Sequence, residues 1–505
     1  MMKYLKTLSI LAVLFLLIGC QSIGNNGVTN DNNVSTEEAM NNVENNQSNN
    51  QENEEVEEVE EVEEVEEVEE VVLFNHLDET QIDSTRAVEL IRELSSEKYA
   101  GRQAGSEANE MAEDYMVNLF KKIGLESPEG LNYKQLYTQK AAYPVKATEI
   151  SVVGSDLELE YQIDFTEKFI MGQTYYDAEI ESEMVFIMER SQLKDDVELL
   201  DGKVLLMTQE VYYDYKTWGR IDKMLADGIE IEAIVVSVEV SAAGMRVARY
   251  IQASEGVEFE ANDPVFINIS SDVFSELTKL SEEDAIIKIS MDYEVIDAEV
   301  ANIVGVIPGK NEIGEDETII IGAHLDHVGN NMNGTYNAGA LDNASGISVM
   351  MELAQAFMAG EQPEDTIIFV AFNGEEDGLL GSEYFAENPP IEYDPNHTQM
   401  LNLDMVGSSG EVPLMICTLD NNGYEMQSQL VSLSNEMDIV NTSNSFGSSD
   451  HVNFSNQGIA SVMLIQFDDA YYHTYMDTVD NAISEERLNN IILLSLAFID
   501  QEAFE

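Results

Sequence analysis

The chain has 505 residues, of which 44% are apolar, so it can bury a sizeable core and fold as about two or three domains. Its 97 acidic residues outnumber the 24 basic ones and give a formal net charge of −73. Binding to nucleic-acid phosphates needs clustered lysine and arginine, so this balance disfavours nucleic acid as a partner.

The N-terminal residues have the layout of a secretory signal. Two lysines precede an uncharged apolar run over residues 8–18, which is too short to span a bilayer, and Cys20 follows shortly afterwards. The sequence LIGC that ends at Cys20 resembles the bacterial lipobox, in which the cysteine is acylated and becomes the mature N-terminus. We therefore expect a lipoprotein signal peptide over residues 1–19 and a lipid on Cys20 that anchors the chain at the extracytoplasmic face of the cell membrane. The alternative is an ordinary signal that contains an incidental cysteine.

The next segment, residues 20–72, is predicted to be a disordered acidic linker. It is rich in Asn, Gln and Ser and then becomes a three-residue repeat of two glutamates and a valine. Dense like charge repels itself, and a period of three matches neither an amphipathic helix nor a strand. We expect an extended, solvated spacer.

The folded part opens with two predicted helices over residues 83–96 and 107–122, the second ending at Gly124. A loop that contains glycines, residues 99–106, separates them. Together with the following residues they form the first part of the main domain, residues 73–142.

From residue 143 to residue 292 the sequence changes to short strand-like runs without long helices. No concentration of histidine, cysteine or paired acids follows these runs. The segment is therefore predicted to be a separate β-rich module inserted into the main domain.

The remaining part, residues 293–505, has an α/β pattern. Apolar strands alternate with helical stretches, and near-continuous apolar strands indicate a mixed, largely parallel sheet covered by helices on both faces. Cys417 lies in one of the apolar runs and is expected to be a small buried residue without a disulfide. The predicted strands cover residues 300–307, 318–324, 366–372, 400–406 and 460–467, and the predicted helices cover 345–358, 379–386, 425–437 and 484–497.

Acids and imidazoles follow the ends of these strands. Each has an ordinary explanation by itself, since an aspartate before a helix is usually an N-cap and glutamates favour a helix N-terminus. Taken together, however, buried acids without partners are strongly disfavoured, and the set predicts a metal site at the carboxyl edge of the sheet. The set consists of His324, Asp326, Asp342, Glu375, Glu376, Asp404 and His473.

The ligand types indicate which metal the site would hold. Imidazole and carboxylate without thiolate suit Zn²⁺, with Co²⁺ or Mn²⁺ as substitutes. Two histidines and three acids are enough for two ions about 3.5–4 Å apart if one carboxylate bridges them, which is an arrangement used for hydrolysis.

This order of residues resembles peptidase family M28, the zinc aminopeptidases, whose pattern is His-x-Asp, Asp, Glu-Glu, Asp and His. The resemblance covers residues 300–505 well, and residues 94–126 resemble the N-terminal segment of the family. Members often carry an inserted protease-associated (PA) domain, and residues 143–292 occupy that place. The resemblance therefore implies a zinc exopeptidase-like fold with a PA-like insert.

The resemblance also implies roles for individual residues. Five are implied to be zinc ligands, namely His324 and Asp404 for one ion, Glu376 and His473 for the other, and Asp342 for both. Glu375 is implied to be the general base, and Asp326 to be the carboxylate that orients the imidazole of His324. Tyr472 is implied to donate a hydrogen bond to the developing oxyanion.

Two further residues are substrate-binding candidates. Asp450 and His451 lie in a segment that resembles the family's Ser-Asp-His sequence but lacks the proline commonly found before its phenylalanine. His327 and His397 have no implied role, and we expect both in solvated loops.

The activity that follows is removal of N-terminal residues from peptides by a membrane-anchored di-zinc aminopeptidase. Two alternatives remain open: a glutaminyl cyclase-like enzyme, which usually uses one zinc and lacks the insert, and a surface binding protein with a vestigial site. The ligands alone do not separate aminopeptidase from dipeptidase or carboxypeptidase action, nor do they give the side-chain specificity.

Overall fold

The structure is a computed structural model of the chain, and it describes residues 74, 76–77, 81–154, 161–171, 177–195, 197–240, 244–247, 264–310, 317–445, 447–468 and 470–504. The predicted signal peptide, the lipidation site Cys20 and the acidic linker lie outside these residues. Within the described part, no helix combines the length and the apolar character that crossing a membrane requires.

The main domain is built on a mixed sheet. Among the described residues it has eight strands in the order β1-β10-β12-β11-β13-β16-β14-β15. Strands β11, β12, β13 and β16 run parallel to one another, and β10 and β14 flank them in the antiparallel direction. The bounds are β1 Lys134–Pro144, β10 Tyr293–Ile307, β11 Thr318–His324, β12 Thr366–Phe372, β13 Thr398–Asp404, β14 Leu414–Cys417, β15 Asn441–Asn444 and β16 Ala460–Ile465.

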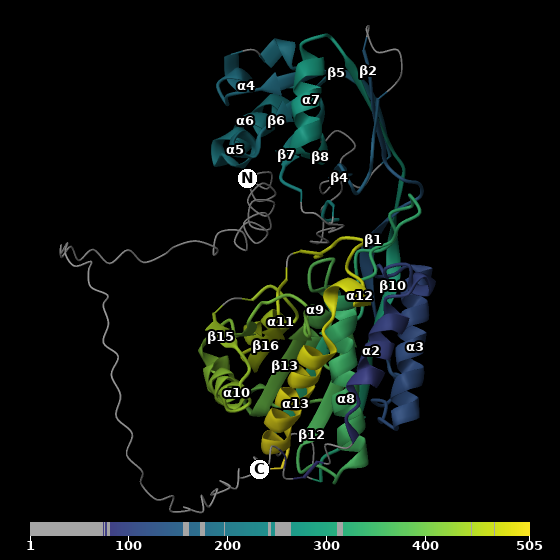
Figure 1. The fold of residues 1–505 in the computed structure, drawn as a ribbon, viewed down its shortest axis with the longest axis vertical. Coiled ribbons are helices and arrows are strands. Elements are labelled where there is room, and N and C mark those ends of the chain that lie inside the picture. The colour runs from purple at the N-terminus through teal and green to yellow at the C-terminus, as the bar shows by residue number, and fades with distance from the viewer. Residues whose placement is uncertain are drawn as a thin grey trace, which may run out of the picture. The chain divides into compact units, whose positions relative to one another are not determined.

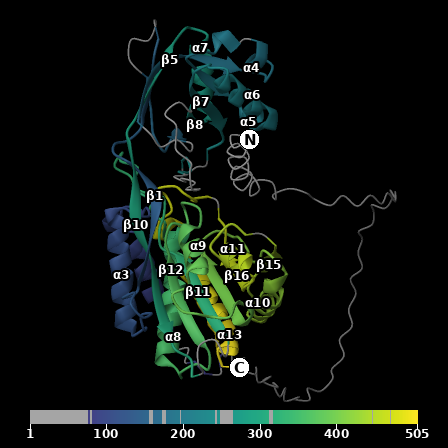
Figure 2. The same cartoon turned by 180° about the vertical axis from the view of Figure 1, so that it is seen from behind.

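Helices cover both faces of this sheet. Successive side chains of a strand point to opposite faces, so Ile319 and Ile321 join one apolar cluster, while Ile320 joins another. Figure 1 shows α8 and α13 in front of the strands, and the reverse view in Figure 2 shows the strands in front. The first cluster includes α2 Ser84–Leu94, α3 Glu107–Ile123, α8 Ser345–Ala359, α10 Tyr424–Glu436 and α13 Glu485–Glu502, and the second includes α9 Leu380–Glu387 and α11 His451–Asn456.

This arrangement confirms the predicted fold class. The helices form where their caps and apolar stripes predict them: the Asp83 carboxylate accepts the backbone N–H of Arg86 at the start of α2, and α3 ends at Gly124 with φ 100°. Cys417 is a buried free cysteine in β14, which confirms its predicted burial. Shorter helical pieces are η2 Glu97–Tyr99, η4 Ala340–Ala344, η5 Pro395–His397, η6 Asn421–Gly423 and α12 Val479–Ala482.

The chain leaves the first sheet at Pro144 and returns at Tyr293, which lie opposite each other at the end of the β1–β10 ladder. We call residues 145–292 the inserted segment. Its described residues form a second eight-stranded sheet with its own apolar cluster. The strands are β2 Glu149–Val153, β3 Tyr161–Ile163, β4 Phe169–Met171, β5 Ala178–Ile187, β6 Lys203–Met207, β7 Ile231–Val238, β8 Val265–Ser270 and β9 Ile286–Met291.

The prediction that the inserted segment lacks long helices is wrong. It contains α6 Tyr215–Ala226 and α7 Ser271–Ser281, besides the short pieces α4 Gln192–Asp195, η3 Val197–Leu199 and α5 Gln209–Tyr213. Helix α6 forms because Trp218, Ile221 and Met224 recur at helical spacing and are buried together on one face. The likeness of this segment to a PA domain, and its boundaries as a domain, stay predictions.

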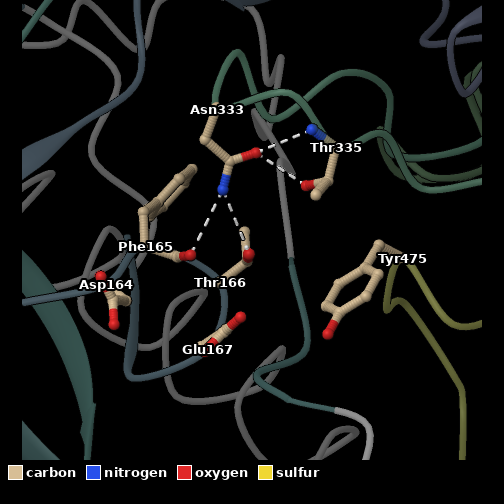
Figure 3. A pocket seen from close by; sticks show the side chains of 7 residues that line it. All are labelled: Asp164, Phe165, Thr166, Glu167, Asn333, Thr335 and Tyr475. Atoms are coloured by element: carbon tan, nitrogen blue, oxygen red, sulfur yellow. Dashed lines mark hydrogen bonds between the residues drawn. The ribbon is translucent and has the colours of Figure 1, made fainter.

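The inserted segment touches the loop that follows β11. The Asn333 side-chain amide donates to the carbonyl oxygen of Phe165 at 3.3 Å and to Oγ1 of Thr166 at 3.4 Å (Figure 3). These three residues line a pocket together with Asp164, Glu167, Thr335 and Tyr475. Tyr475 lies two positions after the predicted ligand His473.

Candidate metal centre

The predicted metal ligands lie beyond the carboxyl ends of the parallel strands. His324 and Asp404 are the last residues of β11 and β13, Glu376 lies in the turn after β12, and His473 lies in the loop after β16. Asp342 lies in η4, which precedes α8. Parallel strands end at one edge of a sheet, and the structure brings all five residues together there.

The first group consists of His324, Asp342 and Asp404. Nε2 of His324 lies 3.3 Å from Oδ1 of Asp342 and 3.4 Å from Oδ1 of Asp404. All three side chains are buried, and their donor atoms lie within 4.8 Å of one another. Nδ1 of His324 lies 3.3 Å from the backbone carbonyl of Asp326. Because a carbonyl only accepts, in the neutral ring this contact places the proton on Nδ1 and leaves Nε2, which faces the two carboxylates, to bind a cation.

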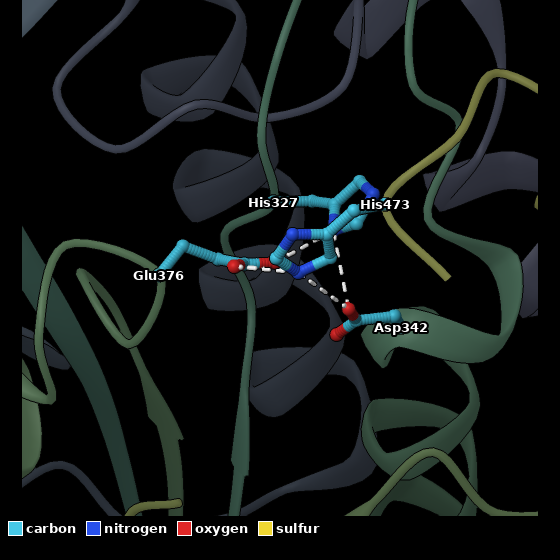
Figure 4. A group of neighbouring side chains, drawn as sticks. All are labelled: His327, Asp342, Glu376 and His473. Atoms are coloured by element: carbon cyan, nitrogen blue, oxygen red, sulfur yellow. Dashed lines mark hydrogen bonds and ion pairs between the residues drawn. The ribbon is translucent and has the colours of Figure 1, made fainter. Parts of the chain in front are cut away.

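The second group contains Asp342, Glu376, His473 and His327 (Figure 4). Nε2 of His473 lies 3.2 Å from Oδ2 of Asp342 and 2.9 Å from Oε2 of Glu376. Asp342 therefore offers Oδ1 to the first group and Oδ2 to the second. This is the geometry required of a bridging carboxylate.

His327 was missed by the sequence analysis, and its expected place in a solvated loop is wrong. Its side chain is buried, and its Nδ1 lies 2.8 Å from Oε1 of Glu376 and 3.7 Å from Oδ2 of Asp342. The loop is held inward because the backbone N–H groups of His327 and Gly329 donate to the carbonyls of Arg102 and Gly101. The other histidine without a role, His397, is exposed in η5 as expected.

The buried donor atoms fit a divalent cation. Within the described residues, Nε2 of His473 and Oδ1 of Asp404 face the other ligands, and both atoms are buried without a hydrogen bond. Polar atoms without partners are costly in the interior, and a bound cation would satisfy them. Imidazole and carboxylate donors without thiolate suit Zn²⁺.

The electrostatics of the second group agree with a cation site. Burial alone would lower the pKa of His473, but the carboxylates of Glu376 and Asp342 raise it to about 10. Burial would raise the pKa of Glu376, but His473 and His327 lower it to about 2. The acids thus favour positive charge between them, and a metal ion that binds there would displace protons.

Asp326 has partners other than those implied by the resemblance. Its carboxylate lies 3.8 Å from Nδ1 of His324, whereas Oδ1 and Oδ2 accept the backbone N–H groups of Glu375 and Glu376, each at 3.2 Å. Asp326 therefore fixes the turn that carries the two glutamates. Gly374 precedes them with φ 68°, and a side chain there would meet Gln139 Oε1 at 2.3 Å.

Glu375 belongs to neither ligand group, yet it lies in the same electrostatic environment. Burial raises its pKa well above the usual value, and Glu376, Asp404 and Asp450 add to the shift while His324 opposes it. A carboxyl group with a raised pKa beside a metal centre suits proton transfer.

Three more predicted residues lie around the centre. The Tyr472 ring stacks on the His473 ring at 3.8 Å between centroids, and burial raises the pKa of its hydroxyl well above normal. Asp450 and His451 are fully buried at the start of α11. Burial also raises the pKa of Asp450, to about 7. The substrate-binding role of these last two stays a prediction.

Two buried residues that the sequence analysis did not single out organise the loops. The Arg102 guanidinium donates to the carbonyls of Leu94, Leu325, Ala338 and Gly339. The Asp477 carboxylate accepts the backbone N–H groups of Leu341 and Asp342. Arg102 lies in the glycine-containing loop over residues 99–106, and Asp477 lies four positions after His473. The nearness of Asp477 to a predicted ligand was the available signal.

Comparisons with known proteins match the part of the chain that contains these site residues. Residues 302–499 match the sequence model of Peptidase family M28. The chain is 34% identical to Aminopeptidase YwaD of Bacillus subtilis (strain 168) over 196 residues, which cover 37% of this chain and 41% of that protein. It is 30% identical to a probable leucine aminopeptidase of Trichophyton verrucosum over 199 residues, which cover 35% of this chain and 51% of that protein. The aligned regions thus span about half or less of these relatives.

Solved structures show the same fold over more of the chain. An aminopeptidase from Aneurinibacillus sp. strain AM-1 has a TM-score of 0.61 at 22% identity, covering 84% of this chain and 95% of that one. BSAP, a zinc aminopeptidase from Bacillus subtilis, also has a TM-score of 0.61, at 21% identity and with 84% and 96% covered. At these identities the likeness is one of fold.

Proposed function

Because residues 302–499 match the sequence model of Peptidase family M28, we propose that this chain is a zinc-dependent aminopeptidase that removes N-terminal residues from peptides. The observation that carries the proposal is the sharing of Asp342, whose two oxygens face separate groups of buried ligands. In this proposal His324, Asp342 and Asp404 hold one Zn²⁺, and Asp342, Glu376 and His473 hold the other.

The proposed chemistry is hydrolysis of the first peptide bond. When bound, such ions polarise the scissile carbonyl and lower the pKa of water. The Glu375 carboxylate takes the proton of the attacking water and then delivers it to the nitrogen of the leaving amine. Its position next to the ligand Glu376 but outside both ligand groups supports both steps, because its carboxylate is left available to bind a proton.

Other residues of the chain orient these groups. Asp326 holds the Glu375–Glu376 turn through two backbone N–H groups, so that Glu376 faces His473 while Glu375 stays outside the ligand groups. The Tyr472 hydroxyl is the proposed hydrogen-bond donor to the negative charge that develops on the carbonyl oxygen when water attacks the carbon. We further propose that lipid on Cys20 anchors the chain at the extracytoplasmic face of the membrane, which the N-terminal lipobox-like sequence supports.

A panel of peptides tests the function. Each peptide is offered with a free and with an acetylated N-terminus, with and without a metal chelator. Release of the first amino acid from the free peptides alone, abolished by chelator, supports the proposal. Formation of pyroglutamate indicates the cyclase alternative, and binding without cleavage by the zinc-loaded protein indicates a vestigial site.

A further inference from the structure

The inserted segment reaches the loop that carries His473. The backbone N–H of Val247 donates to the carbonyl oxygen of His473 at 2.8 Å. In return, Nδ1 of the His473 ring lies 2.9 Å from the carbonyl oxygen of Val247. Val247 and His473 thus make a reciprocal pair across 226 positions of the sequence.

This reciprocal pair determines which nitrogen of the His473 imidazole carries the proton. A backbone carbonyl only accepts, so in the neutral ring the contact places the proton on Nδ1 and leaves Nε2 to bind a cation. His473 also has a left-handed backbone with φ 55°, which is strained for a residue with a side chain. Such a conformation persists where neighbours fix it, and here Val247 bonds to both the ring and the carbonyl.

Val247 is in turn held by other contacts. Its neighbour Met245 donates its backbone N–H to the carbonyl of Thr166 at 2.8 Å, which joins residues 244–247 to the turn before β4. Ile170, Met245 and Val247 pack with Val328, which follows His327 in the main domain. The Asn333 amide bonds to the same turn (Figure 3). The inserted segment therefore contacts both the loop that carries His473 and the loop that carries His327.

The two ligand groups differ in which part of the chain supplies the hydrogen-bond partner of the histidine Nδ1. The His324 ring takes its Nδ1 partner from Asp326, two residues away in the same loop. His473 takes its partner from the inserted segment. Partners of this kind orient ligand imidazoles, and losing one typically weakens metal affinity about 10- to 100-fold.

We infer that the inserted segment is a part of the metal centre: Val247 is a positioning residue for His473, and the contact sets the affinity of one Zn²⁺ of the two. This inference rests on the proposed function, because it assumes that the centre binds zinc. It predicts that a change at this contact weakens one ion selectively and leaves the other in place.

The test uses the full-length chain with Val247→Pro, which removes the N–H donor and displaces the reciprocal pair. Competition with a chromogenic chelator measures the two zinc affinities, and absorption of the Co²⁺-substituted protein reports the ligand geometry of each position. We expect one affinity to fall about 10- to 100-fold and the other to stay unchanged.

Tyr215→Pro is the matched control. Tyr215 is exposed at the first position of α6, where proline is tolerated, and Asp214 before it is already extended with ψ 111°. This variant introduces the same residue into the same segment without touching the contact. We expect both of its zinc affinities to equal those of the wild type.

A second variant keeps the inference falsifiable if Val247→Pro does not fold, as judged by circular dichroism. Asn333→Ala removes the amide bonds to Phe165 and Thr166 from an exposed loop. We expect a smaller, several-fold weakening of the same ion. Wild-type affinity for both ions in the folded variants overturns the inference. A wild type that binds two ions but cleaves no peptide overturns the proposed function alone, and one that binds no zinc overturns both.

Discussion

Oδ2 of Asp477 accepts the backbone N–H of Asp342 at 3.1 Å, while Oδ1 accepts the N–H of Leu341 at 2.9 Å. One carboxylate thus holds the backbone of the residue that both ligand groups share. Asp477 is buried, and its position, four residues after His473, joins the loop of one ligand to the backbone of another.

Asp477→Asn should therefore loosen the bridging position. The amide keeps one acceptor but turns its NH₂ group toward a backbone N–H, which leaves that donor unsatisfied at a cost of about 1–3 kcal/mol. We expect weaker binding of both zinc ions and a lower unfolding temperature of the metal-free protein. Chelator competition and thermal unfolding measure the two effects. Unchanged affinity for both ions would mean that Asp342 is positioned without Asp477.

Much of this centre was predictable because its residues stand at the ends of apolar strands. His324 and Asp404 end β11 and β13, so the parallel arrangement alone brings them to one edge. His327 gave no such signal, because its place in the site is shown only by its contact with Glu376, which lies 49 positions away in the sequence.

The contact between Val247 and His473 could not be predicted from the sequence either. It uses the backbone carbonyl of Val247, which every residue type has, so the amino acid at this position gives no signal. Helix α6 was missed for another reason. Its apolar residues lie between polar ones, and Gly219 interrupts the pattern, so the strand-like runs around it dominated the interpretation.

Glu375→Gln should remove turnover and keep the metal. Glutamine has nearly the same shape, but it cannot take the proton of water, and general-base catalysis typically contributes about 10²- to 10⁴-fold. We expect kcat to fall by that factor with unchanged zinc content. The control is Glu361→Gln, the same change at an exposed position. Near-normal turnover of the Glu375 variant would remove this residue from the role of base.

His327→Gln tests the residue that the sequence did not reveal. The change removes the imidazole whose Nδ1 lies 2.8 Å from Glu376, so Glu376 loses a partner and the second group loses a donor. We expect the zinc ion held by Glu376 and His473 to bind about 10- to 100-fold more weakly. His397→Gln makes the same replacement at an exposed histidine and should change neither ion. If His327→Gln and His397→Gln had equal zinc affinities, His327 would contribute to packing but not to zinc binding.

Arg86→Met should destabilise the fold without a direct effect on the centre. The guanidinium binds the buried Glu352 carboxylate through Nε at 2.7 Å and Nη2 at 2.5 Å, and the Glu352 side chain is 3% exposed. Removing one partner of a buried pair typically costs about 3–5 kcal/mol. We expect the lower end of that range, because the Arg86 side chain is 37% exposed and water can replace it in part.

Urea unfolding measures this loss, and Arg92→Met is the control. Arg92 pairs with Asp480, but both side chains are largely exposed, at 59% and 80%. Such pairs contribute about 0–1 kcal/mol. A loss as small as this in the Arg86 variant would show that Glu352 is solvated when its partner leaves.

The zinc content of the purified full-length chain, compared with that of Asp342→Ala, tests whether one carboxylate bridges two metal ions. Because Asp342 offers one oxygen to each ligand group, we expect about two zinc ions per wild-type chain and the loss of both in the variant. Asp297→Ala, at an exposed aspartate of β10, should keep both. An Asp342→Ala protein that retains zinc at the wild-type level would contradict a centre built around a shared carboxylate.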